Sequence, residues 1–192
     1  MSKDYWNDVY NNNETGWDIG FPSPAIKEYV DQLNEKEQPI LIPGCGNAYE
    51  AEYLLAQGFT DVTLIDIAPS LTAALESKFK KDIGKRIKIT TGDFFNHEGV
   101  YHHILEQTFL SALVPSLREN YADKMHSLLK KGGHLTGVLF NRVFEDSPPY
   151  GGTVQEYKVL FSTKFEIKKM ELCYNSIERR KGSEVFINLI AK

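Results

Sequence analysis

The sequence predicts an α/β fold, with a doubly wound, seven-stranded and mostly parallel sheet that ends in an antiparallel C-terminal hairpin. Apolar runs rich in β-branched residues alternate along the chain with segments in which apolar residues recur at helical spacing. Only polar residues separate the last two runs, so we expect those two strands to pair as antiparallel neighbours. The expected strands lie near residues 39–42, 62–66, 86–90, 101–106, 134–140, 165–172 and 185–190.

Capping residues, prolines and glycines mark helices between these strands. Side-chain oxygens of Ser and Asn accept hydrogen bonds from the first free N–H groups of a helix, and glycine is common just after its last turn. The expected helix starts are Asn47, Pro69, and a capping box formed by Ser116 with Glu119, and the corresponding ends are near Gly58, Gly84 and the pair Gly132 and Gly133.

An aromatic-rich arm precedes the first strand. Apolar side chains at positions 5, 6, 9 and 10 recur at helical spacing, and Ser23 followed by Pro24 is typical of a helix start. Both tryptophans of the chain, Trp6 and Trp17, lie in this arm. The arm either covers one edge of the core or forms an N-terminal helical lid over a site. We expect one domain, with lid and helices in residues 1–36 and the core in residues 37–192.

Composition and charge exclude several classes of partner. With 192 residues and 42% hydrophobic composition, the chain can bury a full core. A net charge of −4 disfavours nucleic acid, because affinity for polyanions comes from clustered Lys and Arg. The two cysteines, Cys45 and Cys173, match no disulfide or metal spacing, and no 18 apolar residues run together. We expect a cytoplasmic monomer without a metal, a membrane partner or a nucleic-acid partner.

Residues 39–52 carry the clearest functional signal. An apolar run leads into a Gly-x-Gly turn at Gly44 and Gly46, a helix begins at once, and Asp66 ends the next apolar run about 20 residues later. Glycines at these positions allow a sharp reversal and a close approach of backbone to a ligand. The alternative is a plain strand-to-helix turn. Ala48 stands where a dinucleotide fingerprint would continue toward its third glycine, so a ligand without a diphosphate fits better.

Acidic residues follow two of the expected strands. Asp66 can accept hydrogen bonds from two ribose hydroxyls, because a carboxylate has two acceptor oxygens. Asp93 could bond the exocyclic amine of an adenine while Phe94 covers the ring face. The alternative for this second pair is a helix cap followed by a core aromatic. In an open parallel sheet such residues gather beyond the carboxyl ends of the strands, where strand order reverses.

Taken in order, the motifs resemble those of the thiopurine S-methyltransferase family. This is a family of class I methyltransferases that use S-adenosylmethionine (SAM), and the similarity is greatest to its bacterial members and plant halide and thiol branch. The resemblance covers nearly the whole chain and implies a Rossmann-like fold, with SAM as cofactor and S-adenosylhomocysteine as product. The motifs span residues 17–20, 43–46, 64–67, 92–95, 108–113, 148–150 and 179–182.

The resemblance also implies roles for individual residues. The two tryptophans would close over the methionine end of SAM, the Gly-Cys-Gly turn would lie beneath it, and the two acidic positions would hold ribose and adenine. Gln107 stands where the plant branch has a tyrosine near the cofactor. The implied cofactor-binding residues are Trp6, Trp17, Gly44, Cys45, Gly46, Asp66, Ile67, Asp93, Phe94 and Gln107.

The methyl acceptor is expected between the arm, residues 106–109 and residues 144–152. A thiol, sulfide, thiopurine or halide needs little general base, whereas an oxygen or nitrogen acceptor more often needs one. Glu106 is the only ionisable candidate at the relevant strand end, which favours a small soft nucleophile. Arg179 or Arg180 either faces an anion or faces solvent. The residues expected to position the acceptor are Trp17, Glu106, Phe109 and Tyr150, with Phe21 as a further aromatic wall.

Other functions share parts of this pattern. A small-molecule O- or N-methyltransferase, or a SAM-binding protein without turnover, would keep the whole cofactor motif. A nicotinamide-dependent oxidoreductase would share the glycine turn and Asp66 but would not explain Asp93 and Phe94. Residues 147–150 match a signature of methyltransferases that act on nucleic-acid amino groups, but they follow the fifth strand instead of the fourth.

Overall fold

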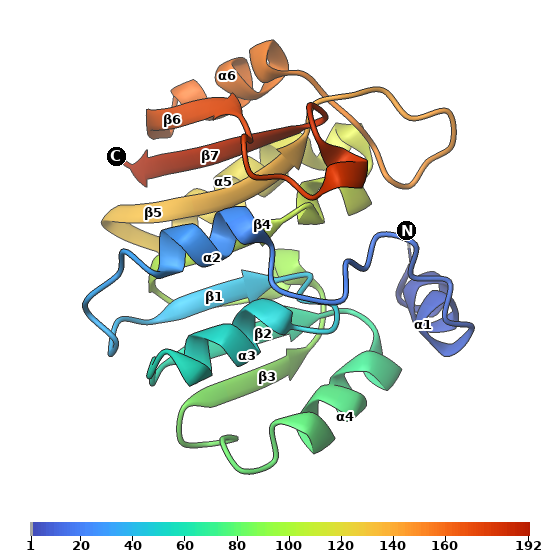
Figure 1. Cartoon of the computed structure of the whole chain (residues 1–192), viewed down its shortest axis with the longest axis vertical. Helices are drawn as coiled ribbons and strands as arrows, with labels where there is room; N and C mark the ends of the chain where they lie inside the picture. The colour runs from blue at the N-terminus through green and yellow to red at the C-terminus, as the bar shows by residue number, and fades with distance from the viewer. Residues whose placement is uncertain (1) are drawn as a thin grey trace.

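The computed structural model describes residues 2–192 and contains one seven-stranded sheet in the order β3-β2-β1-β4-β5-β7-β6 (Figure 1). Strands β1 to β5 are parallel, and β7 runs antiparallel between β5 and β6. This confirms the mostly parallel sheet and its antiparallel C-terminal pair. The strands are β1 (Ile40–Pro43), β2 (Val62–Asp66), β3 (Ile87–Thr91), β4 (Tyr101–Gln107), β5 (Leu129–Phe140), β6 (Phe165–Leu172) and β7 (Glu184–Ala191).

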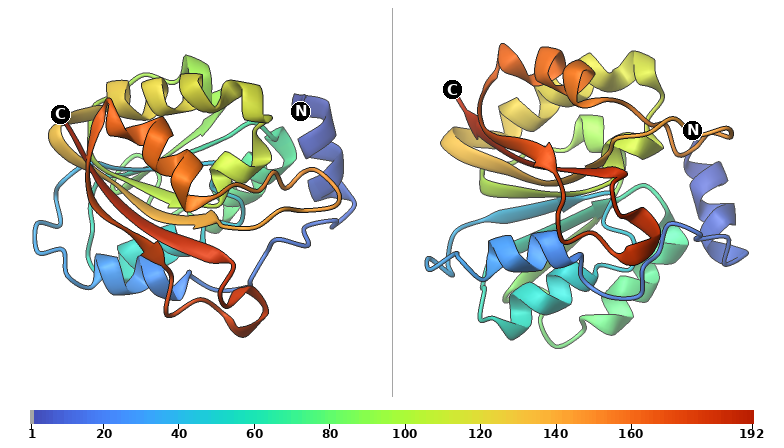
Figure 2. Two further views of the ribbon diagram at one scale, coloured as in Figure 1. Left: turned by 90° about the horizontal axis from the view of Figure 1, so that it is seen from above. Right: turned by 45° about the horizontal axis from the view of Figure 1, so that its top comes forward.

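Helices cover both faces of the sheet (Figure 2). On one face lie α2 (Pro24–Val30), α3 (Tyr49–Ala56) and α4 (Pro69–Lys78), and on the other lie α5 (Arg118–Leu128) and α6 (Val154–Ser162). Each face has its own cluster of buried side chains, with Leu54 of α3 in one and Tyr121 of α5 in the other. Since both faces are packed, every residue of β1 and β2 is buried, as expected for central parallel strands.

Strand order reverses between β1 and β4. The connections that follow these two strands lead to helices on opposite faces of the sheet, α3 after β1 and α5 after β4. The N-terminal helix α1 (Lys3–Asn11) stands beyond the carboxyl ends of these strands (Figure 1). Short 3₁₀ helices lie in the connections: η1 (Phe94–Asn96), η2 (Phe109–Ala112), η3 (Pro115–Leu117) and η4 (Glu178–Arg180). A doubly wound sheet binds ligands at this switch point, so the fold places a site under α1.

The expected cap of α3 is wrong. The helix begins after Ala48, whose backbone is left-handed at φ 55°, and no side chain caps it. The amide of Asn47 instead donates a hydrogen bond to the carboxylate of Asp18 in the N-terminal arm. A contact between distant segments therefore takes the place of the local cap.

The expected capping box of α5 is also wrong. Pro115 begins the short helix η3, and α5 starts at Arg118 without a side-chain cap, so Ser116 and Glu119 do not bond as expected. Strand β5 follows α5 directly at Leu129, which puts the glycine pair at 132 and 133 inside the strand instead of in a turn. Helix α4 likewise ends at residue 78, well before residue 84.

Helix α6 was not expected from the sequence. Its N-terminus carries a complete capping box, in which the Thr153 hydroxyl accepts from the Glu156 N–H and the Glu156 carboxylate accepts from the Thr153 N–H. The Thr-x-x-Glu spacing at this point was the signal that could have identified the helix.

The central strands β4 and β5 approach closely at Gly137. An ideal Cβ at this position would lie 1.8 Å from the carbonyl oxygen of Glu106 on β4, and a backbone atom cannot move aside as a side chain can. We expect Gly137→Ala to lower the free energy of unfolding by about 1–3 kcal/mol or more, measured by urea denaturation. Gly16→Ala is the control, because no heavy atom lies within 4 Å of its Cβ position. Equal stability of the two variants would contradict this packing.

Candidate active site

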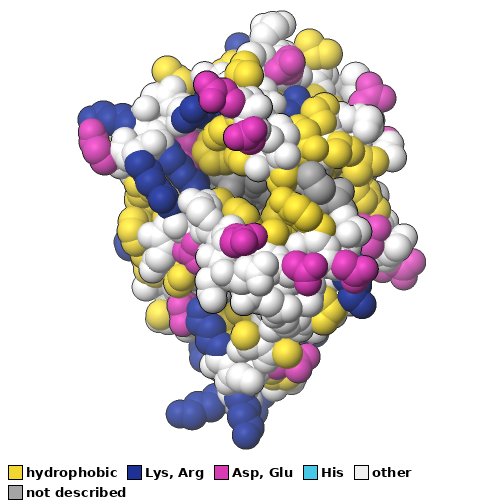
Figure 3. Space-filling view, turned by 90° about the vertical axis from the view of Figure 1, so that its right-hand side faces the viewer, with side chains coloured by type: hydrophobic (Ala, Val, Ile, Leu, Met, Phe, Trp, Pro, Cys, Tyr) yellow, Lys and Arg dark blue, Asp and Glu magenta, His cyan; other side chains and the backbone are white. Residues whose placement is uncertain are grey.

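A cavity of about 570 Å³ opens at the carboxyl ends of the parallel strands. Figure 3 shows this face of the molecule, where hydrophobic side chains surround a hollow. Both α1 and the loop after β5 contribute to its walls. Of the residues predicted to form the site, those that line the cavity are Trp6, Trp17, Gly44, Asp66, Ile67, Asp93, Phe94, Gln107 and Phe109.

Five of the predicted residues do not line this cavity. Cys45 is buried in the core beside α3, where burial raises the pKa of its thiol, and Gly46 contributes a backbone N–H to Asp66. Tyr150 donates its N–H to the carbonyl oxygen of Ser111 at 2.7 Å, which ties the loop after β5 to η2. Phe21, expected as an aromatic wall, is 47% exposed. Glu106 is fully buried and turned away from the cavity.

The turn after β1 owes its shape to Gly44. Its φ is +56°, a left-handed conformation that favours glycine. An ideal Cβ at this position would lie 2.2 Å from Cδ2 of Phe109, so the Phe109 ring occupies the space that a side chain would need. The glycine thus brings the end of β1 against the turn that follows β4.

The carboxylate of Asp66 is 6% exposed and lies at the cavity wall. Its Oδ1 accepts the N–H of Ala68 at 3.1 Å and its Oδ2 accepts the N–H of Gly46 at 3.4 Å. Burial raises the pKa of this carboxyl, and the backbone donors oppose that rise. Because each carboxylate oxygen has room for a second donor, Asp66 can still accept two hydrogen bonds from a ligand.

Asp93 caps a short helix, Phe94 packs in the core, and both also border the cavity. The Asp93 side chain accepts the N–H of Phe95 at 2.9 Å and so caps η1. Phe94 is buried, and its ring meets that of Phe109 edge-to-face with centroids 5.2 Å apart. Both residues also line the cavity, so the cap and the wall are the same two side chains.

The N-terminal arm forms an aromatic wall opposite the strand ends. The ring of Trp17 meets those of Trp6 and Tyr10 edge-to-face, with centroids 5.6 Å and 6.0 Å apart. The arm is attached to the body of the molecule by hydrogen bonds, including one in which Asn7 accepts the N–H of Ser70 at 2.9 Å. The arm therefore borders the cavity and does not merely cover an edge of the core.

The arginines near the C-terminus hold this arm. The guanidinium of Arg180 is buried, pairs with Glu184 at 3.1 Å and donates to the carbonyl oxygen of Trp17. Arg179 donates to the carbonyl oxygen of Asp18 at 2.6 Å. Both arginines line the cavity, so the solvent-facing alternative is wrong for Arg180.

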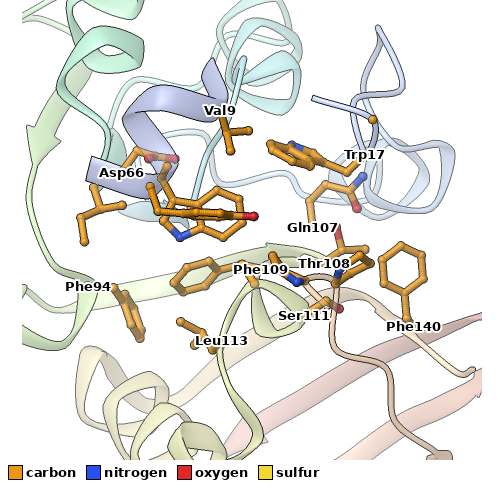
Figure 4. A pocket seen from close by; sticks show the side chains of 18 of the residues that line it. Val9, Trp17, Asp66, Phe94, Gln107, Thr108, Phe109, Ser111, Leu113 and Phe140 are labelled. Atoms are coloured by element: carbon orange, nitrogen blue, oxygen red, sulfur yellow. The ribbon is translucent and has the colours of Figure 1, made fainter. Parts of the chain in front are cut away.

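The cavity has two chemically different ends (Figure 4). Asp66 and Phe94 lie at one end, Trp17, Gln107 and Phe140 lie at the other, and Phe109 lies between them. Six further residues line the cavity without having been given an individual role from the sequence, although all of them except Phe140 lie in segments expected at the site: Tyr10, Thr108, Ser111, Leu113, Phe140 and Phe144.

Two further properties bear on the chemistry. Within residues 2–192, no group of three or more His, Cys, Asp or Glu side chains is arranged to hold a metal ion. In the same described part of the chain, none of the helices has the length and apolar character needed to cross a bilayer.

Comparison with known proteins shows what the chain is similar to. The model of the thiopurine S-methyltransferase family matches residues 1–188. A probable thiol methyltransferase 2 of Arabidopsis thaliana is 31% identical over 185 residues, which cover 93% of this chain and 81% of that protein. A thiopurine S-methyltransferase of Acinetobacter baylyi is 22% identical over 208 residues, covering 95% and 94% of the two chains.

Solved structures share the fold. The 1,6-didemethyltoxoflavin-N1-methyltransferase of Burkholderia thailandensis, with S-adenosylhomocysteine bound, has a TM-score of 0.77 at 16% identity, covering 99% of this chain and 87% of that one. A TehB-like SAM-dependent methyltransferase of Corynebacterium glutamicum has a TM-score of 0.71 at 15% identity, covering 99% and 98%. The chain therefore belongs to the thiopurine S-methyltransferase family and is a SAM-dependent methyltransferase.

Proposed function

We propose that the cavity binds the adenosine part of SAM at its Asp66 end and a small soft nucleophile at its Trp17 end. The acceptor class is a thiol, a sulfide, a thiopurine or a halide, and the reaction is an in-line displacement. The observation that carries the proposal is the division of the cavity into a carboxylate-bearing end and an aromatic end. The relatives' names, with thiol and thiopurine as acceptors, support it.

The residues present fit the cofactor. Asp66 keeps unused acceptor positions, and Gly44 leaves the end of β1 without a side chain. The buried Oε1 of Gln107 finds no hydrogen-bond partner within residues 2–192, so a polar atom at the wall is left for a bound group. Asp66, Asp93 and Phe94 would hold the adenosine part of the cofactor, and Gln107, toward the Trp17 end, would face its methionine part. When bound, the sulfonium of the cofactor supplies an activated methyl group.

The protein's own contribution is orientation and exclusion of water. The rings of Trp6, Tyr10 and Trp17 pack edge-to-face along one wall, and Phe109 is fixed against Gly44 on the other. Holding two reactants in near-attack geometry can contribute roughly 7–11 kcal/mol to lowering a barrier in favourable cases. Rigid aromatic walls are suited to that task.

The acceptor end has little capacity to remove a proton. Among the described residues that line the cavity, the carboxylates are Asp66 and Asp93 at the cofactor end and the exposed Glu14 of the arm. Glu106, the expected ionisable candidate, lies outside the cavity. A thiolate or halide brings its own nucleophilic electron pair and needs no base, and the cationic guanidinium of Arg180 suits an anion.

Asp66→Asn tests the cofactor end. The amide keeps the shape of the side chain but replaces one acceptor oxygen by a donor. Hydrogen bonds to charged groups contribute about 1.5–3 kcal/mol, so we expect S-adenosylhomocysteine to bind roughly 10- to 100-fold more weakly by isothermal titration calorimetry. Glu52→Gln, at an exposed carboxylate of α3, is the control. Unchanged affinity of the Asp66 variant would argue against this assignment.

Trp17→Ala tests the arm as a lid. Loss of the ring opens the wall formed with Trp6 and Tyr10, so we expect weaker S-adenosylhomocysteine binding and slower turnover. Trp17→Phe keeps an aromatic face and should retain most of both, while thermal unfolding reports whether each variant is folded. A Trp17→Ala protein with full affinity and full turnover would show that the arm does not act as a lid.

A panel of acceptors tests the reaction itself. With methyl-labelled SAM, we expect transfer to at least one of hydrosulfide, small thiols, a thiopurine and iodide, and none to phenols or amines of similar size. If only a phenol or an amine gave labelled product, the acceptor would be an oxygen or nitrogen nucleophile and not a soft one. Binding of S-adenosylhomocysteine without transfer to any of these compounds would support the alternative function, a SAM-binding protein without turnover.

A further inference from the structure

Glu106 lies one layer beneath the cavity. It is the penultimate residue of β4, its side chain is fully buried, and it contacts no part of the cavity. Its neighbour Gln107 lines the cavity, because successive side chains of a strand point to opposite sides. Burial of a carboxylate costs free energy unless hydrogen-bond donors surround it. The hydrogen bonds of Glu106 therefore indicate which groups it positions.

Those hydrogen bonds converge on the turn after β4. Oε1 of Glu106 accepts the backbone N–H groups of Phe109 and, at 3.4 Å, Leu110, which begin η2. Oε2 accepts the hydroxyl of Tyr121 on α5. Thr108, between strand and helix, is left-handed with φ 57° although it is not glycine. A residue keeps this disfavoured conformation only when its surroundings hold it there. The N–H of Thr108 donates to the carbonyl oxygen of Val138 at 3.1 Å, and the Glu106 carboxylate holds the two residues that follow it.

The turn carries the wall of the site. Phe109 presses its ring onto Gly44 at the end of β1, and the same ring meets Phe94 edge-to-face. Thr108 and Ser111, on either side, line the cavity as well. A shift of the Phe109 backbone would therefore move both the turn beneath the cofactor and the wall toward the acceptor.

We propose that the ionised carboxylate of Glu106 is the positioning residue of this site, and that its protonation loosens the Phe109 wall and weakens cofactor binding. The inference rests on the proposed function for what the cavity binds. It assigns Glu106 no contact with either substrate, since its carboxylate acts through the backbone of Phe109.

The surroundings make this carboxyl sensitive to pH. Burial raises the pKa of Glu106 to about 7, although the donors from Tyr121, Phe109 and Leu110 lower it. The titratable groups facing it are Tyr121 of α5 and Tyr157 of α6, and burial raises the pKa of both hydroxyls, that of Tyr157 to about 12. Neither tyrosine ionises near neutral pH, so a titration near pH 7 at this turn belongs to Glu106.

Ionisation of Glu106 has opposite effects on stability and on function. It lowers the stability of the fold, whereas it strengthens cofactor binding. The pKa of Glu106 is raised from 4.5, so the folded state holds this proton more tightly than the unfolded chain, and the contribution to stability is lost as pH rises toward 7. Glu106→Gln cannot ionise and should be more thermally stable than the wild type at pH 8, with a Tm several degrees higher. A glutamate whose ionised form stabilises the fold, with a pKa lowered on folding, would give the reverse.

The test uses the ligand-free protein and S-adenosylhomocysteine, whose own groups do not titrate between pH 6 and 8. By NMR, the amide proton shifts of Phe109 and Leu110 should titrate with a midpoint near pH 7 in the wild type and stay constant in Glu106→Gln. S-adenosylhomocysteine should bind the wild type about fivefold more tightly at pH 8 than at pH 6 and bind the variant with one weaker affinity throughout.

Two further variants make the result specific. Glu119→Gln, at an exposed position in the first turn of α5, should behave as the wild type. Tyr121→Phe removes a donor that lowers the pKa of Glu106. The midpoint of the amide titration and the pH at which the affinity changes should therefore both move to higher pH. If the amides of Phe109 and Leu110 do not titrate, or if they titrate while affinity is indifferent to pH, the proposal is wrong. If the wild type binds no S-adenosylhomocysteine at any pH, the proposed function fails, and the amide titration still decides whether Glu106 holds the turn.

Discussion

The site depends on one close contact, the packing of the Phe109 ring onto Gly44. It joins the ends of β1 and β4, the two strands between which the sheet reverses its order. A side chain at Gly44 would collide with the ring, and a displaced ring would leave a gap between the turn and the wall. The cavity floor, its acidic end and its aromatic end are all built around this contact.

Contacts between distant parts of the chain hold the other side of the cavity. Arg180 lies 163 residues from Trp17, yet its guanidinium bonds the Trp17 carbonyl oxygen and stacks over Phe140 with 5.1 Å to the ring centroid. Asp18 bonds Asn47, next to the glycine turn, from the same stretch of the arm. The N-terminal arm is therefore tied both to the cofactor turn and to the C-terminal strands, so closure of the cavity depends on the whole chain.

Sequence patterns predicted the parts of this architecture that depend on local physics. The glycine turn, Asp66 and the antiparallel pairing of the last strands follow from backbone freedom, strand ends and short connections, and the structure has all three. The caps at Asn47 and Ser116 failed because a contact with Asp18 and the start of η3 at Pro115 outweighed local preference. The burial of Glu106 and the role of Arg180 could not be read from spacing, because their partners come from other elements.

The most direct measurement for the central claim is a crystal structure of the protein with S-adenosylhomocysteine. We predict ribose hydroxyls at the Asp66 carboxylate, adenine beside Phe94, and the ring of Phe109 still packed on Gly44. Ligand density in a second cavity, lined in part by residues of α2 and β6, or a Phe109 ring moved away from Gly44 in the complex, would contradict it.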